Sequence, residues 1–453
     1  MLKKFSFKKW LFSGIFFIVI AVISSGLTYY FKFYQQKGFS IDPQAKIDYE
    51  QEYQVTYWDY PLLIGQDKRY KKFLQQAISK FNKRYSNIRV NYQLLSFIEG
   101  PKKLKEALKE GNPPDIYHGI FGRKLVNSKL QIPVSIYLAK EKRDSYSSLA
   151  MAAFSYRKQI WGLPTWLLPE VWVGNKGLLT KAGLDLKKVT KQGWTIDKLL
   201  EITTKLKELD RDNNIIFNPY NARLFQQLLA TIGKNNLVSQ EKKLAIATKD
   251  LENIFQLLDK LQEEKVLPRN RAKMSKMLLS SLWANQAGLI APVNIWLLNS
   301  LYQQSKKQQI DLTLLPIPTF SSQRNRVPIS VTGLLLFRQE NYQGDAHTKA
   351  VYKFAQFMNR QQNLYISKQL NVVPAYLPLQ SVWKREVKLK KLIKKQLITY
   401  VSRGYSKKAT GFANEKLEIK LRTKLRKNYQ NYWLNNLSST AVVNNIWMIG
   451  SRL

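Results

Sequence analysis

The chain has 453 residues, a net charge of +42 at pH 7, 45% hydrophobic residues and 12% aromatic residues, a composition that excludes disorder for most of its length. Without cysteine it forms no disulfide and carries no lipid on a lipoprotein-type cysteine, and with two histidines it offers little for a structural zinc site. About 400 residues follow the first hydrophobic stretch, enough for two large lobes.

That stretch, residues 10–31, follows a basic flank at residues 1–9 that holds four lysines. As a helix, about 22 residues rise about 33 Å, which spans the hydrocarbon core of a bilayer. The preceding lysines favour a cytoplasmic N-terminus and export of the rest. The alternative is a signal peptide cleaved near Ser24, Ser25 and Gly26. We expect an uncleaved anchor, because apolar and aromatic residues continue beyond that point, and a protein that works in the periplasm or at the cell surface.

Residues 32–54 are polar and lack sustained periodicity, which predicts a linker. Strand and helix patterns alternate after it. Apolar residues recur at helical spacing in one segment, and they alternate at strand spacing in the next. The expected order is strand 55–59, helix 70–81, strand 88–94, a helix from Pro101 that stops before Gly111, and strand 115–120. Strands joined through helices need crossover connections, so we expect an α/β fold with a largely parallel sheet.

The alternation returns with longer helices. Thr195 is a suitable N-cap for a helix through Leu206, and a second helix, 251–261, ends before Pro268. A strand at 330–337 and a helix at 350–358 follow.

Residues 210–214 begin like a calcium-binding loop, with Asp210, Asp212 and Asn214 at alternate positions. Ile215 replaces the glycine that such a loop needs, and Asn221 replaces its final glutamate, so we interpret the segment as a turn. Nucleotide-binding glycine loops and serine-hydrolase motifs are absent from the sequence, and we expect no enzymatic activity and no cofactor.

Seven short motifs occur in a fixed order along the chain. They are EGNPPDIYHG (110–119), WGLPTW (161–166), GNKGLLTKAGLD (174–185), GWTIDKLLEITTKL (193–206), ANQAGLIAPVNIW (284–296), HTKAVYKFAQFMNRQQNLYI with NVVPA (347–375) and LSSTAVVNNIW (437–447). Together they resemble the extracellular solute-binding proteins of bacterial ABC importers, in the sugar-binding branch that is similar to maltose-binding protein.

The resemblance implies a two-lobe periplasmic-binding-protein fold of type II with a central cleft that closes on its ligand by a hinge motion. It assigns residues 55–168 and 312–340 to the N-terminal lobe, and residues 169–311 and 341–453 to the C-terminal lobe. It also implies a carbohydrate ligand, ABC permease subunits as partners, and no nucleic acid.

Sugars present apolar ring faces, which aromatic side chains cover, and hydroxyl edges, which polar side chains bond. The family's cleft lies at the carboxyl ends of the strands and beside the interlobe crossovers. The expected ligand-binding residues are Trp58, Asp59, His118, Phe121, Arg123, Trp166, Trp296, Thr332, Tyr405 and Phe412.

Two questions stay open at this point. An uncleaved anchor also suits a membrane-tethered sensor or envelope-binding module of the same fold. The positive charge, which is densest from Lys384 onward with 17 basic against 3 acidic residues, is either a property of the surface or serves an anionic ligand through Arg123. We favour the surface, because the lysines gather late in the chain on helical segments.

Overall fold

The computed structural model describes residues 24, 40–63, 67–209, 215–216, 222–234, 237–239, 241, 243–267, 289–290, 295–307, 309–321, 326–406, 415–435 and 437–451. The chain divides into two compact units, Met1–Lys46 and Ile47–Leu453. Apart from Ser24, the expected anchor at 10–31 lies outside the described residues. Among the residues that are described, no helix is both long and apolar enough to cross a membrane.

The first sheet of the larger unit has the strand order β13-β7-β12-β3-β1-β2, and β14 and β4 also pair with β12. The pairs β1–β2 and β1–β3 are parallel, as the sequence predicts, whereas β12 is antiparallel to β3 and β7. Its strands are β1 (Tyr53–Asp59), β2 (Ile88–Leu94), β3 (Ile116–Gly119), β4 (Gln131–Ile132), β7 (Leu163–Pro169), β12 (Val327–Phe337), β13 (Val373–Pro374) and β14 (Gly404–Ser406).

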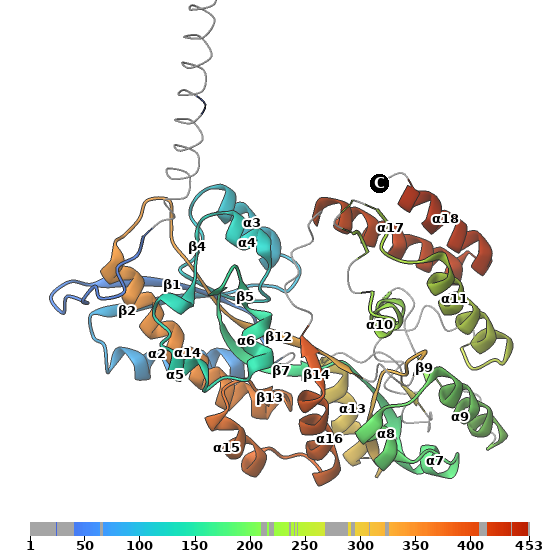
Figure 1. Cartoon of the computed structure of the whole chain (residues 1–453). Coiled ribbons are helices and arrows are strands. Elements are labelled where there is room, and N and C mark those ends of the chain that lie inside the picture. The colour runs from blue at the N-terminus through green and yellow to red at the C-terminus, as the bar shows by residue number, and fades with distance from the viewer. Residues whose placement is uncertain are drawn as a thin grey trace, which may run out of the picture. The chain divides into compact units, whose positions relative to one another are not determined.

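Helices α2 (Asp67–Asn82) and α14 (Asp345–Leu370) pack together on one side of this sheet, and α3 (Gly100–Lys109) and α4 (Arg123–Asn127) lie on the other (Figure 1). The buried residues of α2 are the ones whose spacing predicted the helix. They are Tyr70, Phe73, Leu74, Ala77, Ile78 and Phe81. Their one-sided spacing therefore fixes which face of α2 meets the sheet.

The second sheet has the order β11-β8-β10-β9, with β8 antiparallel to both β10 and β11. Its strands are β8 (Val171–Asn175), β9 (Ile215–Ile216), β10 (Leu289–Ile290) and β11 (Leu312–Pro316). The accompanying helices are α7 (Lys176–Lys181), α8 (Leu186–Gln192), α9 (Ile196–Glu208), α10 (Arg223–Thr231), α11 (Thr248–Glu263), α17 (Glu415–Leu434) and α18 (Ser439–Ser451). Thr195 caps α9 as expected, since its hydroxyl accepts a hydrogen bond from the backbone N–H of Lys198 at 3.3 Å.

The chain passes between the sheets at two described places, from β7 to β8 through Glu170 and from β11 to β12. The second passage comes later than the sequence suggested, because β11, expected in the first lobe, pairs along its whole length with β8. All five residues of β11 are buried, so no polar alternation marks its faces in the sequence. Helix α14, expected with the second lobe, instead packs on the first sheet through rings such as Phe354, which meets Tyr57 and Phe81.

The remaining described elements connect or flank these two sheets. They are the 3-10 helix η1 (Val134–Ile136), helices α5 (Lys140–Arg143), α6 (Ser148–Ala153), α13 (Ile295–Lys307), α15 (Pro378–Glu386) and α16 (Lys391–Ser402), and the hairpin β5 (Ser155–Tyr156) and β6 (Gln159–Ile160).

Candidate functional site

A fully buried carboxylate lies at the carboxyl end of β1. The oxygens of Asp59 accept hydrogen bonds from four neighbours, namely the hydroxyls of Tyr57 and Tyr70, Nε2 of Gln362 at 3.0 Å and the backbone N–H of Tyr60 at 2.8 Å. Burial, and then the charge of Asp59, raises the pKa of both tyrosines well above its ordinary value, so the hydroxyls keep their protons and donate. The carboxylate is thus saturated with donors from β1, α2 and α14.

His118, at the end of β3, is the fifth partner of this carboxylate. Its Nδ1 lies 2.8 Å from Oδ1 of Asp59, and its side chain is only 2% exposed. Because a carboxylate accepts, Nδ1 carries the hydrogen of this bond. Nothing in the described part of the chain bonds Nε2, although it is buried. The imidazole also lines a pocket and meets the ring of Trp166 edge-on at 5.1 Å.

This pocket has a volume of about 450 Å³ and apolar walls. The ring of Tyr60 stacks on Phe97 at 5.0 Å and meets Tyr117 edge-on at 5.8 Å. The hydroxyls of Tyr60 and Tyr117 bond each other, so both are already partnered. The lining residues are Tyr60, Leu62, Phe97, Pro101, Leu104, Tyr117, His118, Gly119, Ile120, Gly122, Leu125, Trp166 and Thr332. Such a pocket suits a ligand with an apolar face and few polar groups.

The pairing of β7 with β12 is irregular at two of these lining residues, Trp166 and Thr332. Thr332 of β12 is opposite Trp166 of β7, but the next residue, Gly333, is opposite Pro164, so Thr165 is an extra residue on β7. The hydroxyl of Thr165 bonds the backbone oxygen of Thr332 at 2.9 Å and its Oγ1 at 3.0 Å. A β-bulge of this kind re-aims neighbouring side chains. Here Trp166 and Thr332 both line the pocket.

Three of the expected ligand-binding residues therefore line one pocket, namely His118, Trp166 and Thr332. Asp59 lies behind His118 with no exposed surface. Trp58 is half-buried on the α3 side of β1, where the ammonium of Lys103 lies 4.7 Å from its ring centre.

The other expected residues are dispersed or undescribed. Phe121 is buried and stacks on Phe154 with ring centres 6.1 Å apart. Tyr405 lies on β14, with the guanidinium of Arg326 at 5.6 Å from its ring. Arg123 begins α4 and Trp296 is the second residue of α13, but their side chains are not among those described. Phe412 lies outside the described residues.

The sequence reasoning missed the pocket's aromatic wall, which consists of Tyr60, Phe97 and Tyr117. Tyr60 and Tyr117 directly adjoin expected residues, and this adjacency was the available signal. No local pattern marks Phe97, which lies between β2 and α3. It reaches the pocket only because the parallel strands bring that connection beside the end of β1.

The described residues contain no group of three or more histidine, aspartate or glutamate side chains arranged to hold a metal ion. The candidate site is therefore the aromatic pocket and its buried His118–Asp59 pair.

Comparison with protein families shows which family the chain belongs to. Residues 65–363 match the model of the bacterial extracellular solute-binding proteins. The chain belongs to this family, whose members act outside the cytoplasm. No curated protein matches it in a sequence comparison.

Solved structures share its fold at low identity. The GacH receptor of Streptomyces glaucescens has a TM-score of 0.64 and 16% identity, with 88% of this chain and 99% of the receptor covered. The cyclic alpha-maltosyl-1,6-maltose binding protein of Arthrobacter globiformis has a TM-score of 0.66 and 14% identity, with 88% of this chain and 98% of that protein covered. The substrate-binding protein Lmo0181 of Listeria monocytogenes, solved with cycloalternan, has a TM-score of 0.66 and 16% identity, with 89% of this chain and 99% of that protein covered.

Proposed function

We propose that this protein captures a carbohydrate outside the cytoplasm and delivers it to an ABC importer, without chemical catalysis. The observation that carries the proposal is the aromatic pocket at the ends of β1 and β3, which is lined by Tyr60, Tyr117 and Trp166. A sugar ring offers an apolar face to such walls.

The family and the ligands of the similar structures support a carbohydrate. One of them was solved with acarbose and another with cycloalternan.

Closure is part of the proposal. The passages from β7 to β8 and from β11 to β12 join the two sheets, and the family's hinge motion acts at such crossings. Arg123, Trp296, Tyr405 and Phe412 remain predicted ligand contacts, and residues of the second lobe are expected to complete the site.

Binding is tested on the full chain by tryptophan fluorescence, titrated with a panel of oligosaccharides. A saturable change with at least one carbohydrate is expected, because Trp166 lines the pocket. Trp166→Phe should remove most of the change. The matched variant Trp447→Phe, at an exposed position of α18, should leave it intact. A panel that gives no saturable response would refute carbohydrate capture.

We also propose that residues 10–31 tether the protein to the membrane. After cell fractionation, the full chain should stay with the membranes in high salt and be released only by detergent. Release by salt alone would exclude a transmembrane anchor.

A further inference from the structure

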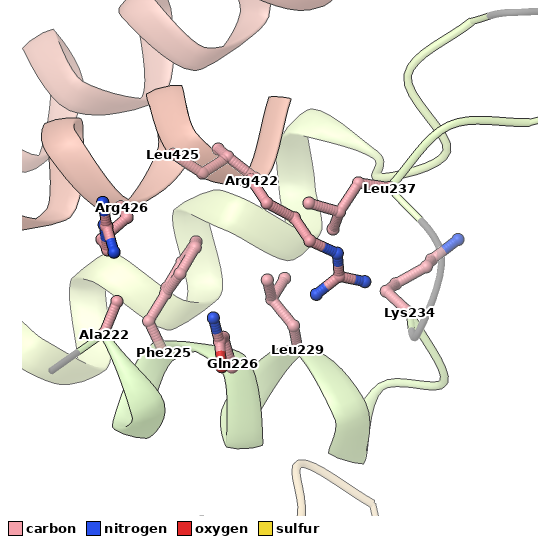
Figure 2. A pocket seen from close by; sticks show the side chains of 9 residues that line it. All are labelled: Ala222, Phe225, Gln226, Leu229, Lys234, Leu237, Arg422, Leu425 and Arg426. Carbon is pink, nitrogen blue, oxygen red and sulfur yellow. The ribbon is translucent and has the colours of Figure 1, made fainter. Parts of the chain in front are cut away.

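A second pocket lies in the part of the molecule built around the second sheet, between α10 and α17 (Figure 2). Its volume is about 60 Å³. One water needs roughly 10–15 Å³ on this measure, so the space holds a few waters or one small ion. A sugar ring with its hydroxyls does not fit. The lining residues are Ala222, Phe225, Gln226, Leu229, Lys234, Leu237, Arg422, Leu425 and Arg426.

Three of these side chains are cationic and none is acidic. Arg422 and Arg426 are four residues apart on α17 and therefore share one face of the helix. Figure 2 shows Arg422 extending from α17, with Gln226 on the α10 wall of the pocket. The amide of Gln226 adds a neutral donor to the two guanidinium groups.

Two carboxylates lie near these cations and neutralise only part of their charge. Glu418 is completely buried, and besides Arg422 at 2.8 Å it accepts the backbone N–H groups of Leu237 and Val238. Asp250 lies 3.9 Å from Lys234, at the limit of an ion pair.

Arg426 makes no ion pair with any residue that the structure describes. Three cations thus stand against two carboxylates, which leaves an excess of one positive charge, that of Arg426.

The remaining walls are apolar, formed by Phe225, Leu229, Leu237 and Leu425. Apolar walls lower the local dielectric constant and strengthen the attraction between a bound anion and the arginines. Guanidinium groups match the oxygens of a phosphate in pairs, which a lysine does not do.

We propose that this pocket binds a phosphate group, either as inorganic phosphate or as the phosphate of an ester such as a lipid headgroup. The site is separate from the aromatic pocket and does not depend on the proposed carbohydrate function. Part of the protein's large positive charge thus serves to bind a specific ligand.

The test is the thermal unfolding of the full chain, titrated with sodium phosphate or glycerol 3-phosphate, with sodium chloride adjusted to keep the ionic strength constant. Both anions are expected to raise the unfolding temperature in a saturable way. Arg426→Gln should weaken the apparent affinity by roughly tenfold, since a charge-assisted hydrogen bond is lost. Arg426 is exposed, so this variant should fold.

Lys427→Gln is the matched control, because it removes one exposed charge from the same helix outside the pocket. It should bind phosphate as the parent does. Tighter binding of inorganic phosphate than of the ester assigns the site to the free ion, and the reverse order assigns it to a headgroup-like ester. Two results would overturn the proposal. One is that sodium chloride raises the unfolding temperature as much as phosphate does. The other is that Arg426→Gln and Lys427→Gln reduce the stabilisation by phosphate equally.

Discussion

Nδ1 of His118 donates to Oδ1 of Asp59 across 2.8 Å, and both side chains are almost wholly buried. The other histidine of the chain, His347, is also buried, but its Nε2 bonds the backbone oxygen of Gln54 at 2.9 Å. His118 thus differs because its ring lines a pocket and its buried Nε2 has no hydrogen-bond partner among the described residues. Asp59 itself has no exposed surface and holds the His118 ring through this hydrogen bond.

Replacing Asp59 by asparagine should destabilise the protein. The amide places an NH₂ group against donors that now meet a carboxylate, among them Nε2 of Gln362 and Nδ1 of His118. We expect the free energy of unfolding to fall by about 2–4 kcal/mol.

Urea denaturation measures this change, with Asp197→Asn at an exposed position of α9 as the control. Equal stability of the two variants would show that the buried network does not depend on the charge of Asp59.

Stability should also fall at alkaline pH. Burial raises the pKa of Tyr57 and Tyr70 above the ordinary value of about 10, and it raises that of Tyr352 to about 12. Above pH 10 the unfolded chain loses these phenolic protons while the folded protein keeps them, so unfolding becomes more favourable as pH rises. Below pH 10 the contribution is fully present.

Unfolding free energies measured from pH 8 to pH 11 test this. Each such tyrosine adds a slope of up to about 1.4 kcal/mol per pH unit above pH 10, and Tyr57→Phe should make the loss shallower. A flat profile up to pH 11, or an unchanged slope in the variant, would contradict it.

Local patterns predicted the first half of the fold well. The helical spacing from Tyr70 to Phe81 and the alternation from Ile88 to Leu94 both fix a buried face, and the structure confirms both elements. Thr195 was predictable as a cap because a cap acts over three residues.

Properties that depend on distant contacts were not predictable. The Thr165 bulge arises from pairing with a strand more than 160 residues away. The role of Asp59 depends on Gln362, which only the folded chain brings to it. Periodicity reports which face of an element is buried, but not against which partner.

The bulge leaves no room at Gly333. A Cβ at this position would lie 2.5 Å from the backbone oxygen of Leu163 and 2.8 Å from the ring of Phe154. The strand must shift to accept it, so Gly333→Ala should cost about 1–3 kcal/mol. Gly122, on the rim of the same pocket, has nothing within 4 Å of such a Cβ, and Gly122→Ala should be close to neutral.

Chemical denaturation of the two alanine variants makes the comparison. If Gly333→Ala unfolds at the same urea concentration as Gly122→Ala, then β7 and β12 can shift apart at Gly333 without a measurable cost in stability.

Glu418 joins α17 to the segment that follows α10. Its buried oxygens accept from Leu237 and Val238 at 2.8–3.0 Å and from Arg422 at 2.8 Å. Glu418→Gln leaves a buried amide facing backbone donors and the guanidinium, and should cost about 2–4 kcal/mol. The control, Glu263→Gln, changes an exposed side chain of α11 and should have little effect on the denaturation midpoint. Comparable losses in both variants would rule out a special contribution of Glu418.

Ligand binding at the two pockets should depend on salt to different degrees. The described lining of the aromatic pocket contains no lysine, arginine, aspartate or glutamate, so a neutral sugar would bind there through stacking and neutral hydrogen bonds. Such contacts are little screened, and we expect the carbohydrate affinity to change less than about twofold between 50 and 500 mM sodium chloride. Phosphate binding at Arg422 and Arg426 should weaken severalfold over the same range. Titrations of one full-chain preparation with both ligands measure the contrast. A steep loss of carbohydrate affinity with salt, removed by Arg123→Ala, would instead show that the carbohydrate is anionic and that Arg123 binds it.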